Sequence, residues 1–226
     1  MRKVLMVICS ILYFCPAFSQ DEVRMYRTET GLVYNQKQFD SIRVSGAIAI
    51  SLISRTESGD TTFTDIKIAP IEQPVVVTKY EDTVLPELVF SDLQGKKYNT
   101  NDLKGHALYI NFWSTSCGPC IAEMPDLSQL KKRYEKKKIL FIGIAPDPAD
   151  ELQRFLKEHP FDFIIVSSDE IFQLLGIDSY PVNFFVDKKG VIKKVSTGTP
   201  VKKNPDTGKW EVSVIENYSK ILDQLM

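Results

Sequence analysis

The sequence predicts an α/β fold: a central mixed sheet flanked by helices, with a small β-rich N-terminal region before it. From residue 83 onward, apolar runs typical of buried strands alternate with amphipathic helical segments, which is the pattern of a parallel or mixed sheet. A Cys-x-x-Cys pair follows one of these runs and opens a helix. We therefore divide the chain into a signal peptide at 1–19, a β-rich region and linker at 20–82, and an α/β domain at 83–226.

Residues 1–19 have the features of a secretory signal peptide. Basic residues give a positively charged start, residues 4–14 form an apolar run, and the small residues Ala17 and Ser19 precede a cleavage site before Gln20. The apolar run is shorter than the roughly 20 residues that span a bilayer. We expect a periplasmic or otherwise extracytoplasmic protein, which stays membrane-anchored if the segment is not cleaved.

Cleavage would leave one cysteine pair in the mature chain. Cys9 and Cys15 lie in the signal segment, so Cys117 and Cys120 remain. An exported protein with a single close pair has no disulfide framework, and such a pair more often performs redox chemistry. We expect these two residues to form the one disulfide of the oxidised protein.

Composition excludes several classes of function. The chain has 226 residues, of which 43% are hydrophobic and 25% charged, and its formal net charge is -1. No basic stripe is present, so we expect no nucleic-acid partner. His106 and His159 have no cysteine or histidine at ligand spacing, so we expect no metal site.

Residues 20–82 contain two strand-like segments and a connector. Residues 48–52 and 63–68 are β-type runs, with a turn at 57–60 between them. Prolines and valines near 70–77 indicate an extended connector. At roughly 60 residues this region is too short for a large core of its own, and no chemistry is visible in it.

Residues 83–226 are predicted to form the α/β domain. The run 107–112 is apolar throughout, as is typical of a strand buried on both faces. The helix after it ends in the lysine-rich run 131–138, which we interpret as a solvated helix end rather than a docking patch. Gly176 is expected to close a short helix. Further strands are predicted at 87–90, 96–98, 139–145, 163–166, 182–186 and 191–195, and further helices at 149–157, 170–175 and 212–225.

The segment around the cysteine pair places a thiol at a helix N-terminus. The apolar run ends at Trp113, residues 114–116 can turn the chain and cap a helix, and Pro119 suits a first helical position. Helix N-termini lower thiol pKa values from about 8.5 to a range of roughly 3.5–7.5. A thiolate at Cys117 and a second thiol at Cys120 are the minimum equipment for thiol–disulfide exchange.

A resemblance to the thioredoxin superfamily rests on the motif Phe112-Trp113-x-x-x-Cys117-Gly118-Pro119-Cys120, followed by Glu123 and Pro125. Within that superfamily, the chain is most similar to the TlpA/ResA-like extracytoplasmic thiol–disulfide oxidoreductases. The resemblance covers about residues 83–226 and implies a thioredoxin-like fold. The extra helix and strand between residues 149 and 166 are similar to the TlpA/ResA-like insertion.

The resemblance implies roles for the dithiol and for a carboxyl group. Cys117 is expected to attack substrate disulfides, and Cys120 to resolve the mixed disulfide. Glu123 lies three residues beyond Cys120 on the same helix face, where it would accept or return a proton; the alternative is a solvated surface glutamate. Asn111 replaces an aspartate that cytoplasmic thioredoxins carry, which strengthens this role for Glu123.

The resemblance also implies a substrate-binding surface. Pro181 would be the family's cis-proline, facing the dithiol, and Tyr180 would offer backbone groups to a bound chain. Trp113, Gly118 and Pro119 complete the expected set of substrate-binding residues. Trp113 is expected either to pack beneath this surface or to shield the thiol.

Two residues depart from the family pattern. Ser116 replaces the tryptophan that commonly precedes the first cysteine, which opens the rim and leaves substrate preference undetermined. Val182 follows Pro181 where threonine is common. In the active-site helix, Pro125 lacks a backbone donor and is expected to bend the helix.

These features predict an exported thiol–disulfide oxidoreductase that reduces disulfides in other envelope proteins, and the resemblance implies cytochrome c maturation as one such process. No cofactor is expected besides the redox-active disulfide Cys117–Cys120. The expected partners are a disulfide-containing protein substrate and a membrane electron donor.

Two alternative functions remain. A thiol peroxidase shares this fold, but Ile110 and Ser114 occupy the positions of its proline and threonine. A non-catalytic binding module would not need an intact Cys-Gly-Pro-Cys.

Overall fold

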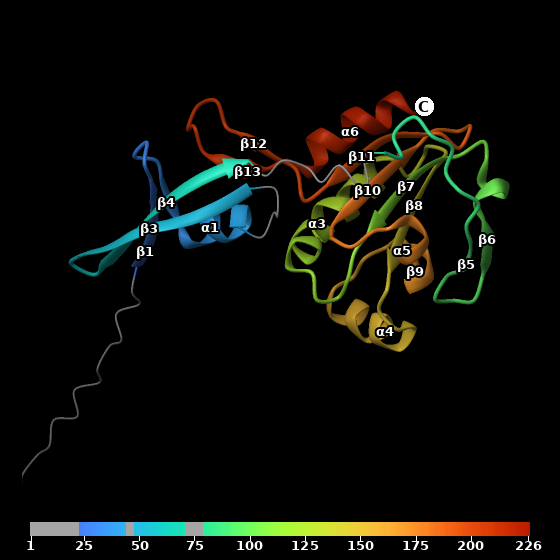
Figure 1. Cartoon of the computed structure of the whole chain (residues 1–226), viewed down its shortest axis with the longest axis horizontal. Coiled ribbons are helices and arrows are strands. Elements are labelled where there is room, and N and C mark those ends of the chain that lie inside the picture. Colours follow the sequence, from blue (N-terminus) through green and yellow to red (C-terminus); the bar gives the residue numbers. More distant parts are fainter. Residues whose placement is uncertain (1–22, 44–47, 71–78) are drawn as a thin grey trace, which may run out of the picture.

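The computed structural model describes residues 23–43, 48–70 and 79–226. The predicted signal peptide and most of the predicted connector lie outside the described residues. Within the described chain, Figure 1 shows a four-stranded sheet from the N-terminal strands and a five-stranded sheet surrounded by helices, and two further sheets of two strands each accompany them. None of the helices within these ranges is long and apolar enough to cross a membrane.

The N-terminal region is a sheet with one helix. Its elements are β1 Val23–Thr28, β2 Val33–Asn35, α1 Gln36–Arg43, β3 Ile48–Ser58 and β4 Thr61–Pro70. The strand order is β2-β1-β4-β3, with β1 and β4 parallel and the other neighbours antiparallel. Both predicted strands are present, but they are longer than predicted because pairing continues to the tight turn at Gly59, where φ is 60°.

The sequence pattern does not predict α1, whose residues are mostly polar. A reciprocal capping pair starts this helix. The Gln38 N–H donates to the Asn35 side chain (2.9 Å), and the Asn35 N–H donates to the Gln38 side chain (3.1 Å). α1 buries Phe39 and Ile42 in one cluster with Tyr34. The spacing of Asn35 and Gln38 is the signal from which this helix could have been found.

A hairpin from much later in the chain packs on α1. Its strands, β12 (Val201–Lys203) and β13 (Trp210–Val212), are antiparallel and are not predicted by the sequence pattern. The Trp210 N–H donates to the hydroxyl oxygen of the buried Tyr34 (2.9 Å). Val201 and Trp210 also pack against the N-terminal cluster. The N-terminal sheet therefore completes its small core with residues from the C-terminal half.

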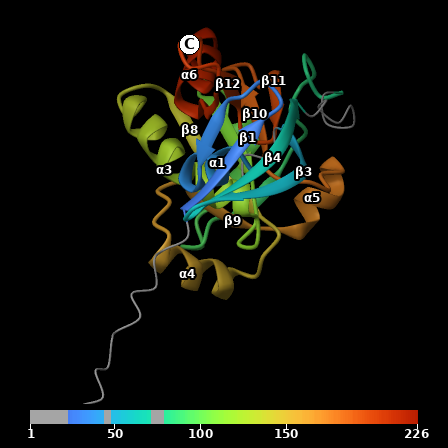
Figure 2. The ribbon, with the colours of Figure 1, turned by 90° about the vertical axis from the view of Figure 1, so that its left-hand side faces the viewer.

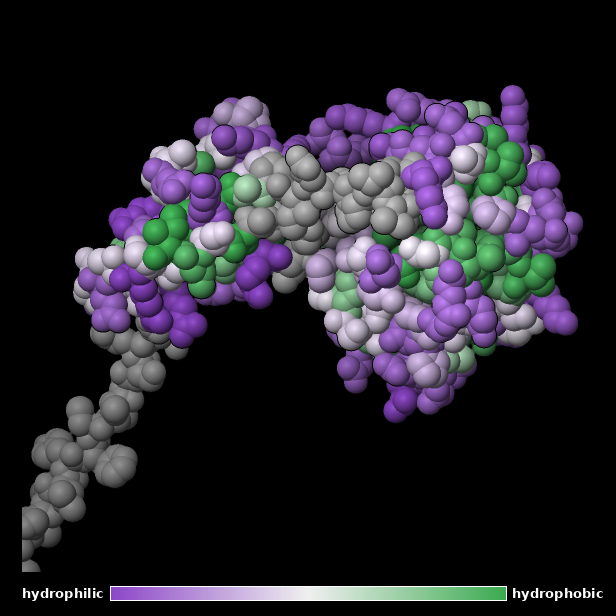
Figure 3. All heavy atoms as spheres, viewed as in Figure 1, coloured by the Kyte–Doolittle hydropathy of each residue, from purple (hydrophilic) through white to green (hydrophobic). Residues whose placement is uncertain are grey.

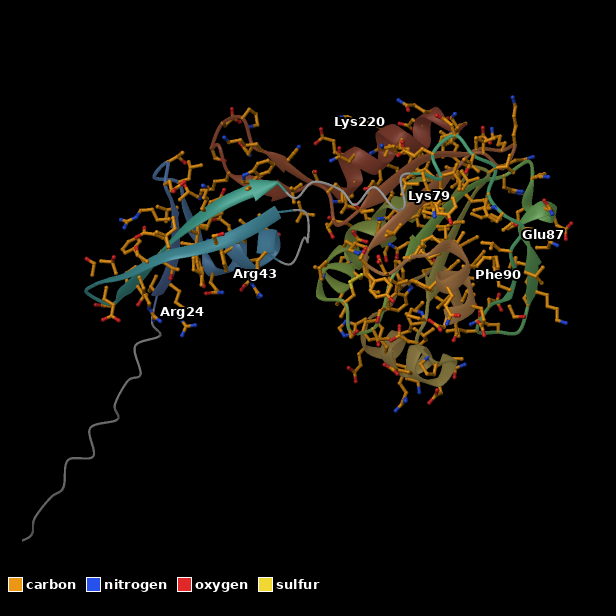
Figure 4. The ribbon with its side chains drawn as sticks, viewed as in Figure 1. Arg24, Arg43, Lys79, Glu87, Phe90 and Lys220 are labelled. Atoms are coloured by element: carbon orange, nitrogen blue, oxygen red, sulfur yellow. A yellow bond between two sulfur atoms is a disulfide. The ribbon has the colours of Figure 1, made fainter. Side chains whose placement is uncertain are left out.

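The outer strand of the N-terminal sheet has exposed apolar side chains. Leu52 and Ile53 on β3 are 71% and 53% exposed, and Figure 3 shows hydrophobic surface over this part of the molecule. A groove of about 440 Å³ is lined by Leu52 and by three arginines, of which Arg24 and Arg43 are labelled in Figure 4. The surface of this sheet is therefore amphipathic.

The larger sheet confirms the predicted α/β fold class. Its elements and the flanking ones are β5 Val89–Ser91, β6 Lys97–Asn99, η1 Thr100–Leu103, β7 Ala107–Phe112, α3 Gly118–Arg133, β8 Ile139–Ala145, α4 Ala149–Glu158, β9 Ile164–Ser167, α5 Asp169–Leu175, β10 Val182–Val186, β11 Ile192–Thr197 and α6 Val214–Gln224. The strand order is β11-β10-β7-β8-β9. Strands β7, β8 and β9 are parallel to one another, and β10 is antiparallel to both of its neighbours, β7 and β11. α3 and α6 cover one face, and α5 covers the other (Figure 2). α3 continues through Pro125, and a bend there stays a prediction.

Gly143 on β8 is expected not to tolerate even one added carbon atom. A Cβ there would lie 3.1 Å from the Trp113 indole nitrogen and 3.1 Å from the Ile165 side chain. Both neighbours are buried, and overpacking of this kind typically costs ~1–3 kcal/mol. Urea unfolding of Gly143→Ala should show that loss, whereas Gly118→Ala, whose Cβ would meet nothing within 4 Å, should not. Equal stabilities would show that the core beneath the cysteine pair adjusts at no cost.

Candidate active site

A disulfide joins Cys117 and Cys120 at the start of α3. β7 ends at Phe112 and a short loop leads into α3, so the pair lies at the carboxyl end of a central strand. Cys117 is half-buried, whereas Cys120 is only 1% exposed. The two sulfur atoms are therefore not equivalent: the first is accessible to a partner, and the second is shielded.

Cys117 is itself the cap of α3. Its Sγ accepts the backbone N–H of Cys120 (3.2 Å), and the helix begins at Gly118. The prediction that residues 114–116 cap the helix is therefore wrong. Pro119 takes the second helical position rather than the first, because the helix starts one residue earlier than predicted. N–H groups at a helix start favour negative charge on such a sulfur.

The loop before Cys117 is held by two carboxylates that sequence reasoning missed. The Thr115 hydroxyl lies 2.6 Å from Asp147 Oδ1 and 2.8 Å from Glu151 Oε1. The Thr115 N–H donates to Asp147 Oδ2 (3.2 Å). Asp147 follows β8, the parallel neighbour of β7, and the carboxyl ends of such strands meet at one edge of the sheet. Its position just after a predicted strand is the signal that could have found it.

Glu123 is fully buried on α3, so the alternative of a solvated surface glutamate is wrong. The Thr199 hydroxyl donates to its Oε2 (3.1 Å), and the Asn111 amide donates to its Oε1 (3.2 Å). Burial raises the pKa of Glu123 to about 8, and these two hydrogen bonds oppose the shift. In the oxidised protein this carboxyl is therefore mostly protonated at neutral pH, and it lies one helical turn beyond Cys120.

Further buried amide and phenol groups continue from Glu123 into the core. Asn183 on β10 pairs directly with Asn111 on β7. Its Oδ1 accepts from the amide of Asn111 (2.8 Å) and from the hydroxyl of Tyr109 (2.7 Å). Its amide nitrogen donates to the Tyr218 hydroxyl oxygen (2.9 Å). Sequence reasoning missed Asn183, Thr199 and Tyr218; the signal for Asn183 is an amide inside an otherwise apolar strand.

The predicted substrate-binding residues divide into two groups. The Tyr180–Pro181 peptide bond is cis, as predicted; Tyr180 is half-buried, whereas Pro181 is buried. Gly118 is exposed and Pro119 is half-buried. Trp113, in contrast, is fully buried. It packs beneath the site, which is one of the two predicted positions. It offers no surface to a substrate, so its predicted place among the substrate-binding residues is wrong.

The fold and this site together define a thiol–disulfide oxidoreductase with a thioredoxin-like architecture. The cysteine pair lies at the start of a helix, just beyond a central strand, with one accessible sulfur and one shielded sulfur. The chain belongs to the Redoxin family, whose model matches residues 79–211. The matched range includes both cysteines and Glu123.

Named relatives are similar to the same part of the chain. The thiol-disulfide oxidoreductase ResA of Geobacillus thermodenitrificans is 32% identical over 122 residues, 53% of this chain and 70% of that protein. The thioredoxin-like protein YneN of Bacillus subtilis is 32% identical over 122 residues, 52% of this chain and 72% of that protein. A thioredoxin family thiol:disulfide interchange protein from Chlorobium tepidum has the same fold, with a TM-score of 0.53 and 22% identity, and the match covers 64% of this chain and 97% of that one. The two relatives of 32% identity confirm the TlpA/ResA-like resemblance and favour thiol–disulfide exchange over the peroxidase and binding-module alternatives.

Proposed function

We propose that this protein is exported and reduces disulfides of other envelope proteins through the Cys117–Cys120 dithiol. The observation that carries the proposal is the asymmetry of the pair, a half-buried sulfur at a helix start beside a shielded one. Export is supported by the signal-peptide pattern of residues 1–19.

Reduction would take two exchange steps. The Cys117 thiolate attacks one sulfur of a substrate disulfide, which forms a mixed disulfide and releases the other substrate sulfur as a thiolate that takes up a proton. The Cys120 thiol then loses its proton and attacks Cys117 Sγ, which forms the internal disulfide and releases the second substrate sulfur. Two electrons pass to the substrate, and a membrane electron donor restores the dithiol.

Glu123, one helical turn beyond Cys120 on α3, would accept the proton of Cys120. Acid–base groups work best when their pKa values lie near the operating pH and near those of their partners. A pKa of about 8 for Glu123 lies near neutral pH. The same carboxyl can therefore accept a proton and give it back, as a reversible exchange requires.

The substrate chain would bind beside the exposed edge of the dithiol. Gly118, Pro119 and Tyr180 form this surface, with Tyr180 offering backbone groups to an extended chain, while Pro181 is buried. Ser116 is exposed on the preceding loop, so the rim is polar where related proteins commonly carry tryptophan.

The dithiol is expected to be reducing. The dipeptide Gly118-Pro119 is the one found in reducing thioredoxins, whose potentials are about -270 mV, against roughly -120 mV for a strong periplasmic oxidant. This difference of about 150 mV corresponds to roughly 7 kcal/mol for a two-electron couple. Equilibration of the mature protein with dithiothreitol buffers, followed by alkylation of free thiols, gives the potential. A value more positive than about -180 mV would replace the reductant role with oxidation or isomerisation.

A further inference from the structure

The hydrogen bonds among the buried side chains next to Glu123 fix the orientation of two amide groups, those of Asn111 and Asn183. Asn183 Oδ1 accepts from both Asn111 and Tyr109, while the Asn183 amide nitrogen donates to Tyr218. Turning either amide alone would set oxygen against oxygen or nitrogen against nitrogen. Because all four side chains are buried, an unsatisfied group here would cost about 1–3 kcal/mol. Single amide flips are therefore strongly disfavoured.

This orientation makes the two oxygens of Glu123 chemically different. Oε1 faces the N–H of Asn111, which can donate but cannot accept. Oε2 faces the hydroxyl of Thr199, which can do either. An ionised Glu123 accepts from both groups, whereas a neutral one can hold its proton on Oε2 while the hydroxyl turns to accept it.

We propose that Asn183 is a positioning residue for Glu123: it keeps an N–H of Asn111 on Oε1 and so leaves Oε2 as the oxygen that gains and loses the proton. The proposal rests on the acid–base role proposed for Glu123 above. Asn183 itself makes no hydrogen bond to Glu123 among the described contacts and acts through Asn111.

Several other groups face Glu123 and bear on its titration. Asp126 on the same helix raises the pKa of Glu123 through its charge. Burial raises the pKa values of Tyr109 and Tyr218 well above their ordinary value, so these phenols stay neutral near pH 8. Cys120, one turn earlier on α3, is held in the disulfide of the oxidised protein. In that state, a change at Asn183 reaches Glu123 through the Asn111 amide.

The principal test replaces the amide with an apolar group of similar size. In Asn183→Leu, the Asn111 amide loses its fixed partner, so the ionised form of Glu123 loses part of its N–H donation. The pKa of Glu123 should rise further, by about one unit. Carbon-13 NMR of the Glu123 carboxyl in the oxidised full-length protein, recorded across a pH titration, measures this pKa as the titration midpoint. The resonance is assigned by its absence in Glu123→Gln. An unchanged midpoint would overturn the proposal.

A second pair of variants, each of which removes a single hydroxyl group, tests the proposal with less risk of unfolding the protein. Tyr218→Phe removes the acceptor of the Asn183 amide and should shift the midpoint in the same direction by a smaller amount. Tyr134→Phe is its matched control, because this buried tyrosine bonds to Ser219 and Asp223 instead. If both variants shift the midpoint equally, the effect is general loosening and the positioning role is wrong. If Asn183→Leu does not fold, this pair decides.

A separate experiment tests the acid–base role of Glu123 itself. If Glu123→Gln leaves the pH dependence of Cys120 alkylation in the reduced protein unchanged, then the acid–base role is wrong, and the positioning role of Asn183 is wrong with it. If Glu123→Gln alters that dependence while the Asn183 and Tyr218 variants leave the NMR midpoint unchanged, only the positioning role fails.

Discussion

Replacing Cys117 with alanine is expected to abolish the reduction of protein disulfides, with turnover falling on the order of 10³-fold or more. Without Cys117 the remaining sulfur, that of Cys120, is only 1% exposed and is therefore shielded from a substrate disulfide. Replacing Cys120 with alanine should instead leave the first exchange step intact and remove the second. Mixed disulfides between Cys117 and substrate proteins should then accumulate.

Two measurements check these opposite outcomes. Insulin reduction reports the loss of turnover, and non-reducing gels of the envelope fraction report trapped complexes. The double variant, which lacks both cysteines, is the control and should give no disulfide-linked complexes, that is, none that a reductant dissociates. Equal trapping by Cys117→Ala and Cys120→Ala would contradict the assignment of the attacking sulfur.

Replacing Glu123 with glutamine is expected to stabilise the oxidised protein at alkaline pH. Burial raises the pKa of Glu123 from an ordinary value of 4.5 to about 8. Between these values the folded state holds a proton that the unfolded state has lost, so the free energy of unfolding falls by ~1.4 kcal/mol per pH unit. The stabilisation by the neutral carboxyl is complete below the unfolded pKa and is lost as the pH rises through the folded one.

Glutamine has the shape of the neutral carboxyl and does not ionise. Its oxygen can accept from Asn111, and its nitrogen can donate to the Thr199 hydroxyl, so the hydrogen bonds of Glu123 are retained. The difference in free energy of unfolding between Glu123→Gln and the parent protein should therefore grow in favour of the variant by up to ~5 kcal/mol from pH 4 to pH 9.

Urea unfolding of both proteins from pH 4 to pH 9 measures this difference. Glu135→Gln, an exposed glutamate just beyond α3, is the matched control and should give a curve parallel to that of the parent. If the curve of unfolding free energy against pH for Glu123→Gln is also parallel to that of the parent, then Glu123 titrates at its ordinary pKa and cannot serve as the proton acceptor near pH 8.

The larger sheet could be predicted closely, whereas the smaller elements could not. β7, β8 and β10 match the predicted strands residue for residue, because a strand covered on both faces is apolar at nearly every position. α1 and the β12–β13 hairpin are short and largely polar. They are held by a few contacts between distant segments, such as the one from Trp210 to Tyr34, and such contacts leave no periodic pattern.

By itself, the sequence determined the dithiol and its place at the start of a helix, because both depend on residues within one short segment. It also indicated Glu123, through its spacing from Cys120. Only the tertiary structure decided that this carboxyl is buried and mostly protonated at neutral pH. Its partners Asn111 and Thr199, and Asn183 next to Asn111, come from three separate segments. The pKa of a carboxyl depends on the surroundings that such segments build together, which no local pattern of residues encodes.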